Sequence, residues 1–175
     1  HSEETGNRIR VDGHKSGYPK GHFYGASGGG SAGRWLGRKG TFLEGGVRVP
    51  AIISYPAKLP QGVVRNQIIT AMDWFPTLLG LCGVKQTAEA PELDGYDLLP
   101  IIRDADAPSQ HKTLHFAWGR GWAVREGDWK LINGKSLHNL ADAKPEAKNY
   151  IKEKPEKAKA LQALHQAWIK KVSKK

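Results

Sequence analysis

One lysine in a glycine-rich stretch is the residue whose surroundings best suit chemistry. Lys39 stands in GRKGTFLEGGVRVPAIIS, residues 37–54, and an ammonium is a compact point charge that can approach one oxygen of a phosphate or sulfate group. Glycines let the main chain come close to a ligand, and the stretch has them at positions 37, 40, 45 and 46. We therefore expect an anion site in which Lys39 stabilises charge on a leaving or equatorial oxygen. This stretch cannot by itself supply a nucleophile.

Two other features of the stretch narrow this hypothesis. Glu44 and Arg48 are four residues apart, and we expect a local ion pair between them that fixes the turn. A phosphate-binding P-loop is excluded, because that motif needs its lysine directly after the second glycine and Ser or Thr next. Here Arg38 precedes Lys39, and Gly40 separates Lys39 from Thr41.

The histidines and the cysteine are weaker candidates. The seven histidines are scattered, at positions 1, 14, 22, 111, 115, 138 and 165. His14 and His22 share the glycine-rich first part with Lys39, so we keep them as candidate substrate-binding residues. No histidine pair has an acidic residue at zinc-ligand spacing, so no metal site is predicted. Cys82, in the apolar run PTLLGLCGV, is predicted to be a buried structural thiol.

The elements around Lys39 follow from local patterns. Residues 1–36 are punctuated by glycines and are expected to form a long loop. VRVPAIIS, residues 47–54, is rich in β-branched residues and predicts a buried strand at an edge or bulge, because it contains a proline. Residues 73–83 predict a helix that Asp73 caps and Gly83 ends, with an apolar face of Leu78, Leu79, Leu81 and Cys82. One short helical turn is expected near residues 98–102.

The second half of the chain predicts a small antiparallel sheet and a helix. TLHFAW (113–118), GWAVREGDWKLI (121–132) and SLHNL (136–140) are short β candidates, and the second breaks into a hairpin at residues 126–128. Residues 154–175 predict a helix that packs on the sheet. Its expected apolar stripe is Leu161, Leu164, Trp168 and Val172.

Composition limits the classes of function. The 175 residues are 39% hydrophobic, enough for an ordinary core. The net charge is +10, but more than half of the excess lies in residues 151–175 without interleaved aromatic residues, so nucleic-acid binding is not expected. No apolar run is long enough to span a bilayer. The polar start, without a methionine or a hydrophobic leader, favours a mature product or a fragment.

Several blocks together resemble the C-terminal portion of the type I sulfatases, of the arylsulfatase kind. They are KGTFLEGGVRVPAIISYPAKLPQG, TAMDWFPTLLGLCGV, LDGYDLLPII and VREGDWKLI, in the order in which the family has them. The resemblance runs from about residue 1 to the terminal helix. It implies an α/β fold: the C-terminal part of an alkaline-phosphatase-like α/β sandwich (residues 1–108), then a small antiparallel sheet with a C-terminal helix (residues 109–175).

The resemblance also implies a chemistry. Type I sulfatases attack sulfur with the hydrate of a formylglycine, made from Cys or Ser in a Cys/Ser-x-Pro-x-Arg motif, beside a calcium ion. Lys39 matches the family's lysine that contacts the sulfate. The formylglycine motif is absent here, since Cys82 is followed by Gly-Val-Lys, and the paired aspartates for calcium are missing. Calcium and formylglycine are therefore expected only in a complete enzyme.

Three hypotheses stay open. The chain is a fragment of a sulfuric-ester hydrolase acting on a sulfated small molecule or carbohydrate, or a non-catalytic module that binds sulfated or other polyanions. The third is a structural fragment that needs the N-terminal part of a sulfatase in order to fold stably. By resemblance, we expect a periplasmic or extracellular protein.

Overall fold

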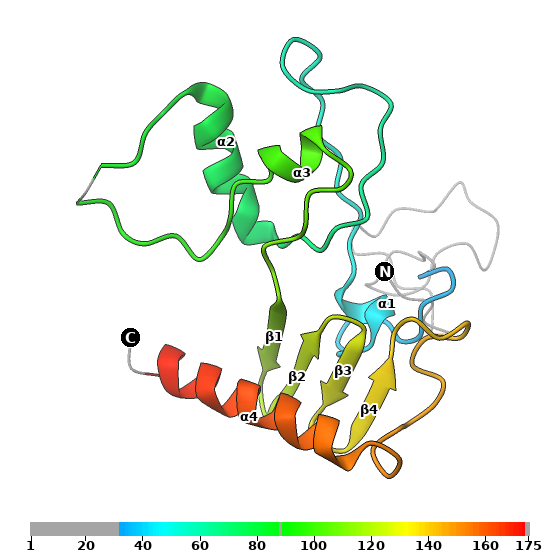
Figure 1. The fold of residues 1–175 in the computed structure, drawn as a ribbon. Coiled ribbons are helices and arrows are strands. Elements are labelled where there is room, and N and C mark those ends of the chain that lie inside the picture. Colours follow the sequence, from blue (N-terminus) through cyan, green and yellow to red (C-terminus); the bar gives the residue numbers. More distant parts are fainter. Residues whose placement is uncertain (1–31, 88, 174–175) are drawn as a thin grey trace, which may run out of the picture. The chain divides into compact units, whose positions relative to one another are not determined.

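The computed structural model describes residues 32–87 and 89–173 and divides the chain into two compact units (Figure 1). The first unit joins the described residues up to Pro50 with those from Thr113 onward, and the second is Ala51–Lys112. Each unit has its own cluster of buried apolar side chains. The predicted boundary at residue 108 stays a prediction.

A four-stranded antiparallel sheet is the centre of the first unit. Its strands are β1 (Thr113–Trp118), β2 (Gly121–Glu126), β3 (Trp129–Ile132) and β4 (Ser136–Asn139), and they pair in the order β1-β2-β3-β4 (Figure 1). The first two turns contain Gly119 and Gly127, whose φ values of 58° and 57° lie in the left-handed region that glycine adopts without strain. The predicted sheet and its hairpin are confirmed.

Helix α4 (Pro155–Val172) packs on one face of this sheet (Figure 1). The register places Val124, Leu131 and Leu137 in one row across β2, β3 and β4. All three side chains are fully buried, and α4 adds Leu161 and Ala158 to their cluster. The predicted helix is confirmed. Within the described ranges, no helix combines the length and the apolar character needed to cross a bilayer.

The predicted apolar stripe of α4 is partly wrong. Leu164 and Val172 are exposed, at 37% and 39%, whereas His165 is buried. A helix turns 100° per residue, so Leu164 lies well to one side of the face that Leu161 and His165 share. Val172 points in the right direction but lies about 16 Å along the axis from Leu161. The last turns of α4 extend beyond the β1 edge of the sheet (Figure 1).

The described residues of the second unit form three short helices. They are η2 (Ala71–Asp73), α2 (Trp74–Cys82) and α3 (Leu99–Arg103). Gly83 ends α2 with a φ of 68°, as predicted. Leu59, Leu81 and Leu99 form the buried cluster that holds the loops and helices of this unit together.

The side chain of Asp73 does not cap α2, contrary to the prediction. It is fully buried and instead accepts hydrogen bonds from the backbone N–H groups of Thr70 (2.6 Å) and Tyr96 (2.8 Å). The Nε2 of His111 lies 2.8 Å from the same carboxylate. Asp73 therefore joins three separate segments of the unit, because a buried carboxylate needs several partners.

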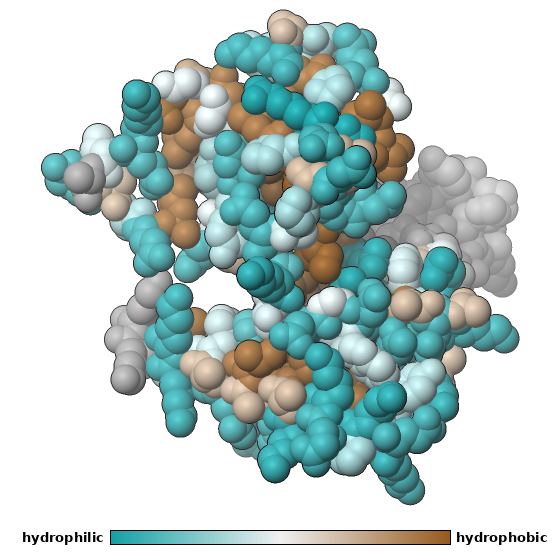
Figure 2. All heavy atoms as spheres, viewed as in Figure 1, coloured by the Kyte–Doolittle hydropathy of each residue, from teal (hydrophilic) through white to brown (hydrophobic). Residues whose placement is uncertain are grey.

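The predicted burial of Cys82 is wrong, and so is part of the predicted apolar face of α2. Cys82 is exposed, Leu78 is 50% exposed and Phe75 is 58% exposed, while Leu81 and Thr77 are buried. Figure 2 shows apolar side chains on the surface of this unit.

The predicted strand at residues 47–54 is also wrong. Helix α1 (Glu44–Val47) occupies its start, and residues 48–54 have no regular secondary structure. Backbone N–H groups of Gly46 and Val47 donate to the carbonyl of Leu43, which closes the helical turn. Ile52 is 92% exposed, so no neighbouring strand packs against the β-branched residues of this stretch.

Candidate anion site at Lys39

Lys39 lies at a tight turn. The backbone N–H of Thr41 donates to the carbonyl of Arg38 (3.0 Å), and the Thr41 hydroxyl donates to the same oxygen (2.8 Å). Gly40, inside this turn, has a φ of 85° that a side chain would strain. The Lys39 side chain is exposed and forms no hydrogen bond or ion pair with any described residue. Its ammonium is therefore available to a ligand.

Lys39 lines a hollow of about 510 Å³, which is within the size range of small-molecule sites. Its other lining residues are Gly40, Thr41, Phe42, Val47, His115, Phe116, Ala117 and Trp118. The walls are mostly apolar, and no acidic residue takes part. An anion in this hollow would therefore meet the Lys39 ammonium without a competing carboxylate from a described residue.

Two glycines hold the Lys39 turn against helix α1. A Cβ on Gly46 would lie 2.3 Å from the carbonyl oxygen of Thr41, and one on Gly45 would lie 2.7 Å from that of Leu36. Both distances are far below any real contact of a Cβ atom. These glycines are therefore needed for the close approach of the loop to its own helix.

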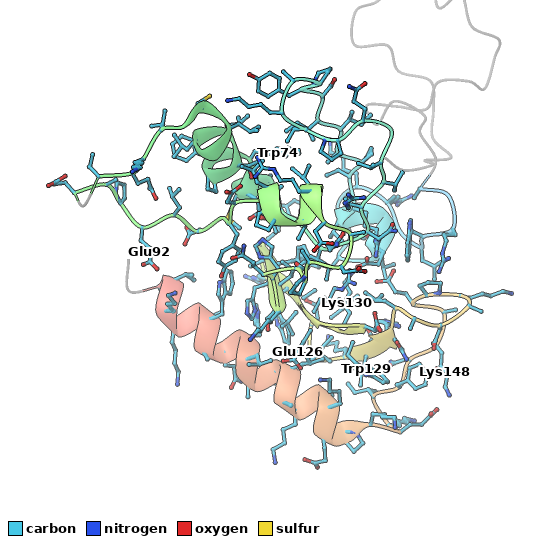
Figure 3. The ribbon with its side chains drawn as sticks, turned by 45° about the horizontal axis from the view of Figure 1, so that its top comes forward. Trp74, Glu92, Glu126, Trp129, Lys130 and Lys148 are labelled. Carbon is cyan, nitrogen blue, oxygen red and sulfur yellow. The ribbon has the colours of Figure 1, made fainter. Side chains whose placement is uncertain are left out.

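A buried carboxylate anchors α1 to the sheet. Glu44 is 1% exposed, and the predicted ion pair with Arg48 is present. The Lys130 ammonium of β3 donates to Glu44 at 2.7 Å, and the Arg125 guanidinium of β2 lies at 3.4 Å from it. Figure 3 labels Lys130 on its strand beside Trp129. Burial would raise the pKa of Glu44, but the charge of Lys130 and hydrogen bonds from Lys130 and Arg48 outweigh burial and lower it.

Glu146 completes this charge network. It is 5% exposed, accepts the backbone N–H of Glu44 at 2.8 Å and lies 3.1 Å from the Lys130 ammonium. Its φ of 65° is left-handed, which a non-glycine residue adopts only where its surroundings hold it. The network therefore fixes the start of α1, which follows the Lys39 turn directly.

Sequence reasoning missed Lys130 and Glu146. A signal for Lys130 exists in WKLI, where period-two alternation puts it on the face opposite Trp129 and Leu131. A lysine at such a position in an otherwise apolar strand implies a buried acidic partner. Glu146 stands in the polar run KPEAKN, where no pattern marks it.

Of the other histidines, His115 is the one described residue that also lines the Lys39 hollow. His14 and His22 lie outside the described residues. His111 contacts Asp73 in the second unit. His115 and His165 stack on Trp168 and Trp122 between the sheet and α4. Burial, with a smaller contribution from His165, lowers the pKa of His115 to about 4, so its imidazole is neutral at pH 7.

The described residues offer no calcium site. No group of three or more His, Cys, Asp or Glu side chains in residues 32–87 and 89–173 could hold a metal ion. The two buried acidic side chains that hold helix α1, Glu44 and Glu146, are already paired with basic side chains and, for Glu146, a backbone N–H. The described part of the chain therefore supplies a cation and a hollow, without a metal centre.

Comparison with known proteins identifies a matching family. The model of the family described as N-sulphoglucosamine sulphohydrolase, C-terminal, matches residues 33–174, which include the Lys39 turn, the sheet and α4.

Relatives of known identity are sulfatases. The chain is 36% identical over 113 residues to the steryl-sulfatase of Mus musculus, covering 59% of this chain and 17% of the relative. It is 32% identical over 136 residues to the N-acetylgalactosamine-6-sulfatase of Homo sapiens, covering 65% of this chain and 26% of the relative. The chain thus spans about a quarter or less of the length of these relatives.

A solved structure has the same fold. The crystal structure of Ps i-CgsB superposes with a TM-score of 0.68 at 24% sequence identity, covering 83% of this chain and 34% of that one. The predicted fold class, an alkaline-phosphatase-like C-terminal portion with a small antiparallel sheet and a C-terminal helix, is confirmed.

Proposed function

Since the chain belongs to the sulfatase family whose model describes the C-terminal part of N-sulphoglucosamine sulphohydrolase, we propose that it supplies Lys39 to the active site of a sulfuric-ester hydrolase. The observation that carries this proposal is the position of Lys39. Its ammonium has no partner among the described residues and lines a hollow of about 510 Å³ that no acidic residue lines.

The chemical role follows from the charge that develops during hydrolysis. When the bond between sulfur and the ester oxygen breaks, the leaving oxygen gains negative charge. An ammonium beside that oxygen, or beside an equatorial sulfate oxygen, stabilises this charge more in the transition state than in the bound ester. The Glu44 network supports this role, because it fixes the backbone directly after the Lys39 turn and so limits the ammonium's range of positions.

We propose that the nucleophile comes from polypeptide outside this chain and that the metal binds outside its described residues. The chain has no Cys/Ser-x-Pro-x-Arg sequence from which a formylglycine forms. Its described residues do not fit a calcium site. We propose that a complete sulfatase joins both groups to Lys39.

The substrate is proposed to be a sulfated small molecule or carbohydrate. The relatives' names concern steryl and N-acetylgalactosamine-6 sulfates, which share only the sulfate ester. This common group is the part that Lys39 would contact, while His14 and His22 stay candidates for substrate contacts. A periplasmic or extracellular location is proposed by analogy with exported sulfatases.

Steady-state kinetics of the complete sulfatase polypeptide test the proposal. Lys39→Ala should lower kcat/KM for an aryl sulfate by roughly 10²–10³, the scale of losing one charge-stabilising donor. Lys135→Ala is the matched control, because Lys135 is an exposed lysine in the turn between β3 and β4, away from the hollow. Equal activity of both variants would remove Lys39 from the active site.

The same experiment distinguishes the hydrolase from the second hypothesis, a non-catalytic module that binds sulfated polyanions. The excess of basic residues in 151–175, including Lys170 and Lys171 in the last turn of α4, favours it. A module of this kind would bind a sulfated polymer with the strong salt dependence of exposed charges, and the complete polypeptide would hydrolyse no sulfate ester.

A further inference from the structure

The Lys39 hollow contains a tryptophan that the fold of the described residues leaves uncovered. Trp118, the last residue of β1, lines the hollow together with Lys39 and is 71% exposed. Within the described part of the chain its side chain stacks on no other ring and forms no hydrogen bond. All the residues that line the hollow belong to the first unit, so the packing of that unit alone places them together.

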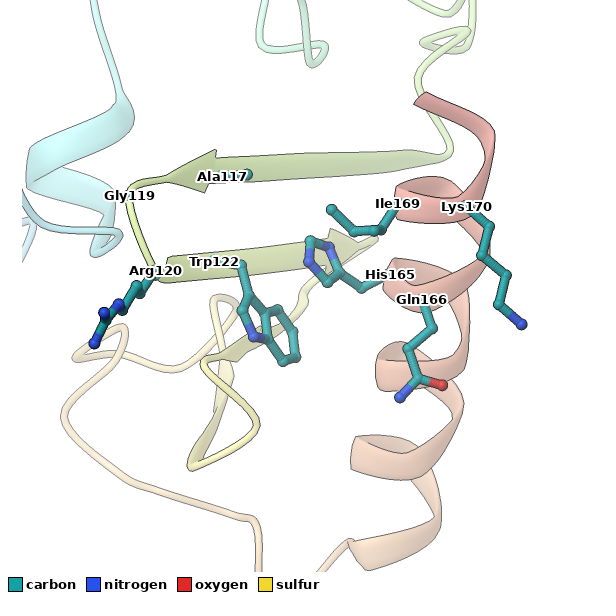
Figure 4. Close-up of a pocket in the computed structure, with 9 residues that line it drawn as sticks. Ala117, Gly119, Arg120, Trp122, His165, Gln166, Ile169 and Lys170 are labelled. Carbon is teal, nitrogen blue, oxygen red and sulfur yellow. The ribbon is translucent and has the colours of Figure 1, made fainter. Parts of the chain in front are cut away.

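Strand alternation directs Trp118 towards the Lys39 turn. Its neighbour Ala117 pairs with Trp122, whose ring stacks on His165 of α4 (Figure 4). Successive side chains of a strand point to opposite faces of the sheet, so Trp118 points to the face that α4 does not cover. Helix α1 is held on that second face through the ion pairs of its buried carboxylate with β2 and β3. Trp118 and the Lys39 turn therefore share one side of the sheet.

Two phenylalanines extend the apolar wall beside Trp118. Phe116 comes two residues earlier on β1 and so lies on the same face, and it also lines the hollow. Phe42, which follows the Lys39 turn, packs on Gly121, where a Cβ would lie 2.6 Å from the phenyl ring. Gly121 is the register partner of Trp118, so Phe42 reaches the sheet directly opposite the tryptophan. Aromatic side chains that gather in one cavity are typical of a ligand site.

Polar side-chain groups are few in the described lining of the hollow. The Thr41 hydroxyl already donates to the carbonyl of Arg38 at 2.8 Å and accepts its backbone N–H at 3.2 Å. His115 lies on the α4 face of β1, where its ring stacks on Trp168. Among the described lining residues, this leaves the Lys39 ammonium as the side-chain group available to a ligand. A sugar needs partners for its hydroxyl groups, whereas an apolar ring needs none, so the lining suits one anionic group joined to an apolar ring.

We propose that Trp118 determines which sulfate esters the Lys39 hollow accepts, by stacking on a flat, apolar ring in the alcohol part of the ester. This inference rests on the proposed function, because it takes the Lys39 ammonium as the group that contacts the sulfate. The ester oxygen is bonded both to sulfur and to the ring, so the ring must lie next to the sulfate, where the hollow is aromatic. Stacking acts equally on the bound ester and the transition state, so it should lower KM without raising kcat.

Steady-state kinetics of the complete sulfatase on phenyl sulfate and 2-naphthyl sulfate test this proposal. The two leaving phenols have similar acidity, so the esters differ mainly in the area of the ring. Trp118→Ala should raise KM about tenfold for 2-naphthyl sulfate and about threefold for phenyl sulfate, with little change in kcat. The fold should persist, because the side chain is exposed. Trp118→Phe, which keeps an aromatic ring, should recover most of the loss.

Leu164→Ala is the control variant, because Leu164 is an exposed apolar residue of α4 that does not line the hollow. It should leave KM for both esters unchanged. An equal rise in KM for the two esters in Trp118→Ala, or a change in kcat alone, would overturn the proposal. A loss on glucose 6-sulfate as large as that on 2-naphthyl sulfate would overturn the assignment of an apolar ring.

Lys39→Ala distinguishes a failure of this inference from a failure of the proposed function. If Lys39→Ala lowers kcat/KM for both esters while Trp118→Ala leaves the ratio of their KM values unchanged, the proposed function stands and the role of Trp118 is refuted. If Lys39→Ala has no effect on either ester, the proposed function fails, and the inference about Trp118 fails with it.

Discussion

Replacing Lys130 by methionine tests whether the buried charge network holds the Lys39 turn in place. The lysine side chain is fully buried, and its ammonium lies 2.7 Å from Glu44 and 3.1 Å from Glu146. Methionine keeps a long apolar side chain but removes the charge. Two buried carboxylates then lose the cation that lies between them.

The expected loss of stability depends on the partners that Glu44 and Glu146 keep after Lys130 is replaced. Glu44 keeps Arg48 and the more distant Arg125, while Glu146 keeps a single backbone N–H. Breaking a buried ion pair by removing one partner costs about 3–5 kcal/mol. We expect a loss in the lower part of that range at pH 7, because the charge of Glu44 is still balanced by Arg48 and Arg125. A second substitution, Glu146→Gln, should restore part of the loss, since it removes the least compensated charge.

Hydrogen exchange of the β2, β3 and β4 amides is the suitable assay, because it reports on the first unit alone. A loss of about 3 kcal/mol lowers protection roughly 100-fold. Lys157→Met is the matched control: Lys157 pairs with Glu126 at the same 2.7 Å, but the two side chains are 31% and 39% exposed. An exposed pair contributes about 1 kcal/mol or less. Equal losses in the two variants would refute the reasoning, since burial would then not set the cost.

Two further substitutions probe the loop and the helix. Gly46→Ala places a Cβ 2.3 Å from the carbonyl oxygen of Thr41, so it should destabilise the first unit by about 1–3 kcal/mol in the same exchange assay, and unchanged protection would contradict the loop packing. His115 has a folded pKa of about 4, below its ordinary 6.5, so the unfolded chain binds the proton more readily. Its contribution to stability is full above about pH 6.5 and is lost as the pH falls to about 4. The melting temperature should therefore fall as the pH is lowered across that window, and it should fall less steeply in His115→Asn. If the melting temperature of this variant fell with pH as steeply as that of the wild type, another group would cause the effect.

The sheet and α4 could be predicted from the sequence because their signals are local. Alternation along residues 113–140 and glycines at the first two turns determine the strands, and the apolar period of 154–172 determines the helix. Which face of α4 is buried was less predictable. His165 replaces Leu164 because it stacks on Trp122, a contact between residues far apart in the chain.

The site could be predicted only in part. The free cation and the Glu44–Arg48 pair follow from a stretch of ten residues, 39–48. The helix at 44–47 could not be foreseen, because Glu44 is held by Lys130, Arg125 and Glu146, which lie 81 to 102 residues further along. These distant contacts override the strand propensity of residues 47–54.

The role of the Lys39 ammonium is tested most directly by the dependence of hydrolysis on the leaving group. In the complete sulfatase, kcat/KM of the wild type and of Lys39→Ala would be compared on aryl sulfates whose phenols differ in pKa. If the ammonium stabilises the leaving oxygen, the effect of Lys39→Ala should grow as the phenol becomes a poorer leaving group and approach roughly 10³ for the least acidic phenol. If wild type and Lys39→Ala had nearly equal kcat/KM values for every aryl sulfate in the series, Lys39 would not stabilise the leaving oxygen.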